Sequence, residues 1–495
     1  MNRDPTTGNR YPDAPRTGYR LPATGYLQIV SCIVVAVALG ALCLQLRWPW
    51  ATTVGERGDM RLFAEWAQTG GSLRAAGESL GELYVRRPNC NYPPFYPTVL
   101  SFLPSIHEWW YGVPGLNPHL IHRVPQSTKS PHARAHARVT ASAQLLKLPA
   151  MLADVAITVL ILAWVWARGS ALRAVVAAGL WVINPVSIYN SAYFGQVDAI
   201  HSLWMLAALL AAVEEHPATA WAFTALALLT KLQAIVIVPV IALLTVQPAL
   251  TAVLRRDPEA IRQQVRRLLI AALAAGIVAW IILAPFVRAG TLHLVRKVYA
   301  NSVSETNNAR TTVTAHNLWW LLLDARPIPR TVIPRDDRPL AGPLTARHLG
   351  YALFVLLTAT ACLALATGGG RCTALLAAAV IGLGFFLLST QMKARYGFAG
   401  MVLTMPLIVC GYRYVFVTAI LSATLLLNGA DVLKLPDGFL HIAGLVNALG
   451  RFEWTGHGGA AVNLLVLGYL LFELTGRARR EQSPVTGVRS PQAGA

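Results

Sequence analysis

The stretch AQLLKLPAMLADVAITVLILAWVW, residues 143–166, decides the class of this protein. Only Lys147 and Asp154 are charged in it, and a helix of this length spans the roughly 30 Å hydrocarbon core of a bilayer. Similar apolar runs recur along the chain. We therefore predict an all-α, polytopic bundle of about twelve transmembrane helices over residues 27–46, 143–166, 171–190, 198–213, 217–230, 233–247, 268–287, 346–366, 373–391, 396–411, 413–428 and 460–475.

The overall composition agrees with a membrane protein. Hydrophobic residues make up 55% of the 495 residues and charged residues only 13%, which is too little polar surface to cover a soluble globule. The net charge of +19 would suit nucleic acid, but the basic residues lie in loops between apolar runs rather than along one amphipathic face. We therefore expect membrane lipids as partners and no nucleic acid.

Clusters of basic residues predict the orientation of the chain in the membrane. They lie in the N-terminal tail and at Arg168, Arg173, Arg255, Arg256, Arg262, Arg266, Arg267, Arg477, Arg479 and Arg480. The positive-inside rule assigns all of them, and both termini, to the cytoplasm. The transmembrane domain then covers residues 27–475, between cytoplasmic tails 1–26 and 476–495 that we expect to be disordered.

Two large loops then lie outside, residues 47–142 and 288–345. Within the first, residues 93–111 are short, broken by proline and carry His107 and Glu108, so we expect an interfacial segment. The alternative is that they cross the membrane, which would export Arg168 and Arg173. The six cysteines predict neither a disulfide framework nor zinc spacing.

Unusual polar residues fall on the outer side in this topology, and charged groups there usually line a polar cavity. The candidate site comprises Asp59, Gln196, Asp198, Lys231, Gln233, Lys393, Arg395 and Tyr396.

Short motifs in a fixed order extend this pattern: Gly58-Asp59 with Phe63 and Trp66, Asn91-Tyr92-Pro93-Pro94, Lys147-Leu148-Pro149 with Asp154, Asn184-Pro185, Gly195-Gln196-Val197-Asp198, Lys231-Leu232-Gln233, Asn317-Leu318-Trp319 and Arg395-Tyr396. From about residue 55 to 400 the chain resembles the GT-C glycosyltransferases, in particular bacterial relatives of the second GPI mannosyltransferase. The resemblance implies transfer of a sugar from a polyprenyl-phosphate donor to a lipid or glycan acceptor at the outer membrane face. It is incomplete in two places: Asp59 has only Glu56 and Glu65 nearby instead of an acidic pair, and Lys393-Ala394 stands where relatives often have His-Glu.

Inverting transfer from such a donor needs a base for the acceptor hydroxyl and cations for the departing phosphate. We assign the base to Asp59, since partial desolvation beside a membrane cavity makes a carboxylate a stronger base. The alternative is a solvated carboxylate paired with Arg57 or Arg61. Arg395 and Lys393 are candidates to bind the phosphate, and ordinary snorkelling to the interface is their alternative.

The remaining polar residues have open assignments. Gln196 and Asp198 either orient acceptor hydroxyls and the base or form a structural turn. Lys231 needs an anionic partner, which is Asp154, Asp198 or the lipid phosphate. Lys147 and Asp154 share a helix face and predict a salt bridge or a tie to a neighbouring helix.

Histidines 107, 119, 122, 132 and 136 enrich the first loop. His132 and His136 have helical ligand spacing, but a third ligand is missing, so we predict no metal site and leave any cofactor unassigned.

The sequence thus predicts a membrane hexosyltransferase with Asp59 as base, and the resemblance ranks mannose ahead of glucose or arabinose. Two alternatives stay open: a lipid or lipid-linked-sugar transporter without chemistry, and a homologue that binds the sugar lipid without turning it over.

Overall fold

The computed structural model describes residues 23–52, 55–111, 141–304, 309–322, 333–452 and 454–482. Each predicted range overlaps apolar helix. The helices concerned are α1 (Ala23–Ala51), α7 (Ala141–Arg168), α8 (Ala171–Val182), α9 (Pro185–Ile188), η3 (Tyr189–Phe194), α10 (Asp198–Val213), α11 (Pro217–Thr230), η4 (Leu232–Ile237), α12 (Val238–Leu254), α13 (Pro258–Arg288), α16 (Ala346–Gly368), α17 (Arg371–Leu388), η6 (Ala394–Tyr396), α18 (Gly397–Thr404), η7 (Met405–Cys410), α19 (Arg413–Val432) and α21 (Thr455–Gln482).

These helices make the chain an α-helical integral membrane protein. In the described residues, 8 helices are long and apolar enough to cross a membrane, or 9 if the bent pair of 171–182 and 185–194 is counted as one span. Three shorter apolar helices cover 198–213, 217–230 and 394–410. The number that crosses the bilayer stays a prediction.

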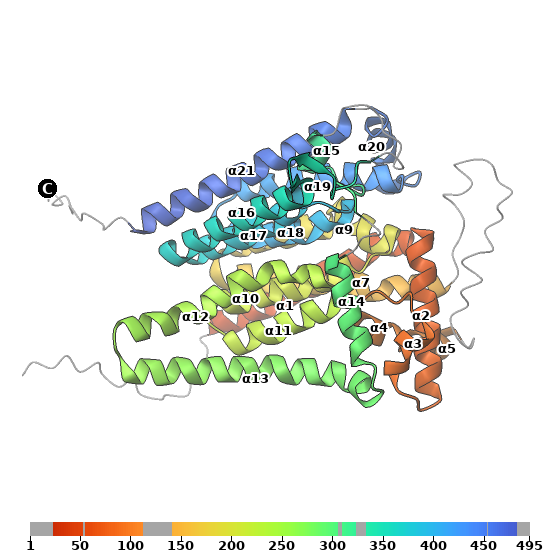
Figure 1. The fold of residues 1–495 in the computed structure, drawn as a ribbon, viewed down its shortest axis with the longest axis horizontal. Coiled ribbons are helices and arrows are strands. Elements are labelled where there is room, and N and C mark those ends of the chain that lie inside the picture. The colour runs from red at the N-terminus through yellow and green to blue at the C-terminus, as the bar shows by residue number, and fades with distance from the viewer. Residues whose placement is uncertain are drawn as a thin grey trace, which may run out of the picture.

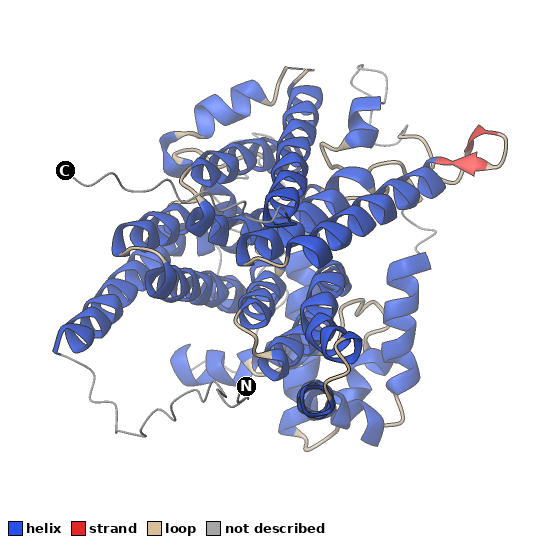
Figure 2. Cartoon of the chain, turned by 90° about the vertical axis from the view of Figure 1, so that its left-hand side faces the viewer, coloured by secondary structure: helices blue, strands red, loops and turns tan. Residues whose placement is uncertain are grey.

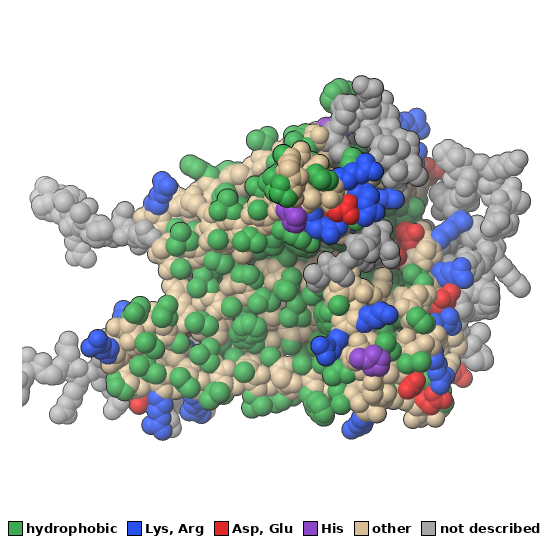
Figure 3. Space-filling view, viewed as in Figure 1, with side chains coloured by type: hydrophobic (Ala, Val, Ile, Leu, Met, Phe, Trp, Pro, Cys, Tyr) green, Lys and Arg blue, Asp and Glu red, His purple; other side chains and the backbone are tan. Residues whose placement is uncertain are grey.

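The long helices lie side by side, whereas α2 (Arg57–Ala75) and α14 (Leu292–Ser304) run across one end of the bundle (Figure 1). We call this the site end, because it carries Asp59. The opposite end, which we call the arginine end, carries Arg168, Arg255, Arg371 and Arg477. Figure 2 looks onto the arginine end. Hydrophobic side chains cover the body of the bundle on the face drawn in Figure 3, and most Lys and Arg side chains lie toward the two ends.

The predicted helix 171–190 is broken rather than continuous. Asn184 leaves the helical conformation and caps α9, its side chain accepting hydrogen bonds from the backbone N–H of Val186 and Ser187. Pro185 disfavours helix at the residue before it, which explains the break. The two parts are bent by 40°, and this bend brings η3 to the site end.

The two outer loops hold helices of their own. The first contains α2, η1 (Leu80–Glu82), α3 (Leu83–Arg86), α4 (Phe95–Leu100) and α5 (Leu103–Tyr111). With 6 and 9 residues, α4 and α5 are too short to span a bilayer. The second contains α14, α15 (Leu318–Leu322) and an antiparallel hairpin of β1 (Pro339–Ala341) and β2 (Leu344–Thr345), a small addition to the all-α prediction. After α19 come η8 (Phe439–His441) and α20 (Ala443–Leu449).

Three predicted boundaries are wrong. Residues 476–482 belong to α21 rather than to a disordered tail, because their arginines are good helix formers and continue the helix. The helix α1 begins at Ala23, inside the predicted tail 1–26. The helix predicted over 373–391 ends at Leu388, before an extended Ser389. The rest of both tails and residues 112–140 lie outside the described residues.

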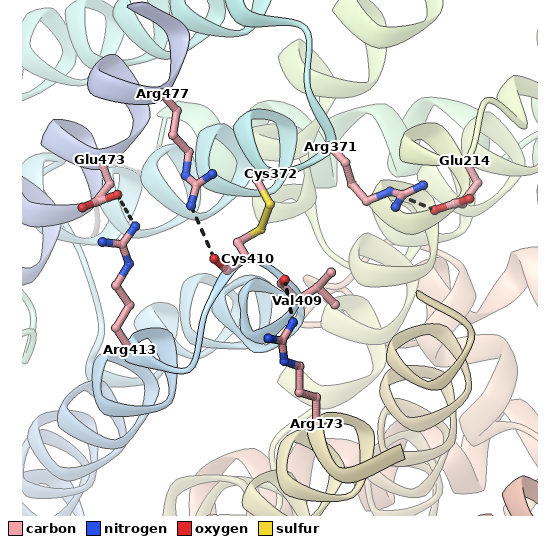
Figure 4. Close-up of a disulfide and its surroundings, with 9 residues drawn as sticks. All are labelled: Arg173, Glu214, Arg371, Cys372, Val409, Cys410, Arg413, Glu473 and Arg477. Carbon is pink, nitrogen blue, oxygen red and sulfur yellow. Dashed lines mark hydrogen bonds and ion pairs between the residues drawn. A yellow bond between two sulfur atoms is a disulfide. The ribbon is translucent and has the colours of Figure 1, made fainter. Parts of the chain in front are cut away.

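A disulfide between Cys372 and Cys410 at the arginine end corrects the expectation of no disulfide (Figure 4). It joins the start of α17 to the end of η7, with Cα atoms 5.8 Å apart. The two cysteines are 38 residues apart in sequence. They meet only because 371–410 folds back as a helical hairpin, which no local spacing reveals.

Arginines surround this disulfide. Arg173 donates to the carbonyl of Val409 and Arg477 to that of Cys410, each at 3.4 Å. Arg371 pairs with Glu214 at 3.5 Å, and Arg413 with Glu473 at 2.6 Å (Figure 4). Backbone carbonyls at helix ends carry partial negative charge, so Arg173 and Arg477 stabilise the end of η7.

The two charged residues of the deciding stretch have separate partners. Asp154 accepts a hydrogen bond from Arg47 Nε of α1 at 2.8 Å, and both side chains are fully buried. Lys147 Nζ donates to the carbonyls of Ala192 and Tyr193 at 2.7 and 3.0 Å. Each of the two side chains therefore binds a neighbouring element, Asp154 binding α1 and Lys147 binding η3. The alternative of a Lys147–Asp154 salt bridge is wrong. Sequence reasoning missed Arg47, which ends a predicted apolar run.

Candidate functional site

Arg395 lies between two carboxylates at the site end. Its Nη1 atom is 3.0 Å from Asp59 Oδ2, and its Nε atom is 3.9 Å from Asp198 Oδ2. Asp59 comes from the first turn of α2, Asp198 begins α10, and Arg395 lies in η6. Three segments far apart in the sequence thus converge on one guanidinium, which agrees with the predicted grouping of these residues.

Local capping fixes Asp59. Glu56 caps α2, and its Oε2 atom accepts a hydrogen bond from the Asp59 backbone N–H at 2.5 Å. The Glu56 N–H donates to the Phe194 carbonyl at 3.2 Å, which ties the start of α2 to the end of η3. Asp59 pairs with Arg395 rather than with Arg57 or Arg61, and Arg61 pairs with Glu65.

Gln196 holds Asp59 from the bundle side. Its Nε2 atom donates to Asp59 Oδ2 at 2.8 Å, and its side chain is buried. The preceding Gly195 has φ +81°, and a Cβ atom there would lie 2.5 Å from Met60 Sδ. Only glycine fits this left-handed turn against α2, which is the physical reason for the Gly195-Gln196 motif.

Lys231 pairs with Asp198, one of the three partners that the sequence left open. Asp198 is 1% exposed and also accepts a hydrogen bond from Asn190 Nδ2 at 3.4 Å. The Lys231 ammonium lies 5.0 Å from the centre of the Tyr396 ring. Burial lowers the pKa of Lys231, and the Asp198 carboxylate opposes that shift.

The turn that carries Lys393 and Arg395 is braced by the second outer loop. The backbone N–H of Val313 donates to the Met392 carbonyl at 3.0 Å, and the Ala394 N–H donates to Thr314 Oγ1 at 3.0 Å. Lys393 immediately precedes η6. This bracing fixes the direction in which Arg395 enters the site.

A cavity of about 220 Å³ opens at this cluster. Its polar wall includes Glu56, Asp59, Lys393 and Arg395, and the rest is mainly apolar: Val186, Tyr189, Phe194, Ala394, Phe398, Leu425, Gly429 and Val432, with Asn190, Val313 and Thr314. It is smaller than the roughly 300–1,000 Å³ of typical drug-sized sites. Its size and its division into charged and apolar walls suit the head group of an amphipathic ligand.

Some residues lie outside this arrangement or were missed. The Gln233 side chain makes no hydrogen bond to the described residues, so the structure does not join it to the cluster. Tyr92 lies near Arg395 and Asp59, and burial raises the pKa of its phenol, so it stays protonated. Glu56 and Asn190 were not predicted. The Asn190 side chain carries a weak sequence signal, a polar residue at the end of an apolar run.

A metal is not indicated by the described part of the chain, where no three His, Cys, Asp or Glu side chains group to hold one. His119, His122, His132 and His136 lie outside the described residues.

Comparisons with known proteins place little constraint on this site. No protein-family model and no curated protein matches the chain. Among solved structures, ArnT from Cupriavidus metallidurans, described as bound to undecaprenyl phosphate, aligns over 93% of this chain and 78% of its own length, with 14% identity and a TM-score of 0.38. At that level the alignment establishes no family, and the function proposed below rests on the residues of the site.

Proposed function

We propose that the protein is a membrane glycosyltransferase of GT-C type, which moves a hexose from a polyprenyl-phosphate donor to a lipid or glycan acceptor. One observation carries this proposal: the ion pair between Asp59 and Arg395, 3.0 Å apart, lies at a cavity whose other walls are mainly apolar. A base for the hydroxyl proton, a cation for a phosphate and an apolar wall for an isoprenoid chain are what such a transfer needs.

The proposed chemistry assigns one task to each group. Arg395, with Lys393 beside it, binds the donor phosphate. Asp59 takes the proton of the acceptor hydroxyl as its oxygen attacks the anomeric carbon on the face opposite the phosphate. The bond from that carbon to the phosphate oxygen breaks, and polyprenyl phosphate leaves with the electron pair. Gln196 orients Asp59, and the Lys231–Asp198 pair supports Arg395.

Mannose is the first sugar to test, because the ordered motifs from Gly58-Asp59 to Arg395-Tyr396 resemble bacterial relatives of the second GPI mannosyltransferase. The outer membrane face is the expected side, because the basic clusters lie at the other end of the bundle.

Purified full-length protein incubated with radiolabelled polyprenyl-phosphate mannose and a membrane lipid extract should form a new labelled lipid or glycan. Donors carrying glucose or arabinose serve as competitors that rank the sugar. Donor that binds but stays intact with every extract would contradict transfer and favour the binding-only homologue. Donor that crosses sealed vesicles unchanged would favour the transporter.

A further inference from the structure

The Asp59–Arg395 ion pair occupies the place that a donor phosphate needs. Both side chains line the cavity, and the guanidinium donates to Asp59 Oδ2 at 3.0 Å. The Arg395 side chain is only 16% exposed, so few of its N–H groups face open solvent. A guanidinium binds carboxylate and phosphate oxygens through the same fork of donors. Asp59 and an incoming phosphate therefore compete for Arg395.

The charges of the cluster around Arg395 already balance without a ligand. Glu56, Asp59 and Asp198 are acidic, and Lys231, Lys393 and Arg395 are basic. Lys231 is bound to Asp198 in a buried pair. A phosphate thus enters a neutral site whose arginine has a partner, and it binds tightly only if a carboxylate gives way.

Of the two carboxylates near Arg395, Asp59 is the one that can separate from the guanidinium. Its side chain is 28% exposed, whereas that of Asp198 is 1% exposed. Water can solvate Asp59 once its pair opens, but separating Asp198 from its cations would strand a buried charge at high cost. Asp198 also stays near Arg395 when Asp59 departs, so the guanidinium keeps its position.

We propose that Asp59 is a latch on Arg395 which the phosphate of a lipid-linked donor opens. The phosphate replaces Asp59 on the guanidinium, and the released carboxylate turns to the acceptor hydroxyl. This inference rests on the proposed function and gives it an order: the donor binds first, and the acceptor meets a free Asp59 only afterwards. No covalent bond changes in this step.

The test is the equilibrium affinity of the purified full-length protein for radiolabelled undecaprenyl phosphate, which needs no turnover. Asp59→Asn removes the competing charge but keeps the side-chain size, so it should bind the probe roughly fivefold more tightly, the factor equivalent to about 1 kcal/mol of ion pairing. Glu65→Gln is the matched control. It removes one carboxylate from the same helix, where Glu65 pairs with Arg61 and not with Arg395, and its affinity should stay within about twofold of wild type.

A double-mutant cycle shows whether the effect runs through Arg395. In an Arg395→Ala background, Asp59→Asn should no longer tighten binding. Unchanged or weaker affinity in Asp59→Asn, with wild type binding the probe, would overturn the latch and leave the proposed function standing. Wild-type protein that fails to bind the probe at all would instead contradict the proposed function, and the latch with it.

Discussion

At Arg395 a guanidinium faces two carboxylates at unequal distances, 3.0 Å to Asp59 and 3.9 Å to Asp198. The nearer carboxylate is the more exposed one, so the side that can open faces the cavity. Lys393 lines the same cavity from the start of the turn. Arg395 and Lys393 therefore carry the same charge but differ in geometry. Substitutions at the two positions can separate the effect of geometry from that of charge.

We predict that Arg395→Lys weakens donor use more than Lys393→Ala does. Lysine keeps the charge but loses the planar fork of N–H donors that binds phosphate oxygens. The measurement is the KM for polyprenyl-phosphate sugar, expected to rise by about tenfold or more in Arg395→Lys, the effect of about 1.4 kcal/mol. Equal donor KM in wild type and Arg395→Ala would remove Arg395 from the donor site.

The residue types of the site could be predicted from the sequence, but their pairing could not. Asp59, Gln196, Asp198, Lys231 and Arg395 stand out because charged or amide groups beside apolar runs are costly. Their mutual distances depend on how α2, α10 and η6 pack, which no local pattern encodes. Gln233 fits the same pattern as Lys231 but lies outside the cluster.

At the scale of elements, buried polar ties decide how α1, α7 and η3 fit together. Arg47 of α1 bonds Asp154 of α7, and Lys147 of α7 binds carbonyls of η3. The Asn184-Pro185 break is predictable in principle, since proline disfavours helix at the residue before it. The Cys372–Cys410 link is not, because it depends on two helix ends meeting.

Removing one partner of the buried Arg47–Asp154 pair should destabilise the bundle strongly. We expect Asp154→Leu to cost about 3–5 kcal/mol, because it leaves the arginine uncompensated, and the double variant Arg47→Met with Asp154→Leu to recover much of that. The measurement is the free energy of unfolding in detergent.

Arg335→Gln is the control, since its pair with Asp337 is about half exposed and should contribute under about 1 kcal/mol. If Asp154→Leu proved no more harmful than Arg335→Gln, the pair would not tie α1 to α7.

At the scale of the whole molecule, the orientation of the bundle in the membrane is a prediction on which two physical rules bear. The arginine end is expected in the cytoplasm by the positive-inside rule. The disulfide at that end argues the other way, since disulfides persist mainly in oxidising compartments. Two physical rules thus disagree about one surface, and the orientation stays a prediction.

Labelling of single cysteines in a cysteine-free background decides between the two orientations. Arg61 of α2 and Arg262 of α13 are both exposed and lie at opposite ends of the bundle, so each is replaced by cysteine. We expect an impermeant thiol reagent to label position 61 on intact cells and position 262 only after permeabilisation. The reverse pattern would invert the protein and move the proposed chemistry to the cytoplasmic face.

Sugar transfer by the cluster at the site end is the function that most needs a direct test. The most direct measurement is the rate of label transfer from polyprenyl-phosphate mannose by wild type, Asp59→Asn and Glu65→Gln, prepared and assayed side by side. Asparagine keeps the size of Asp59 but cannot accept the proton, so we predict transfer lowered by roughly two to four orders of magnitude, while Glu65→Gln stays near wild type. Near wild-type transfer by Asp59→Asn would show that Asp59 is not the base, and loss of transfer in Glu65→Gln alone would move the base to Glu65.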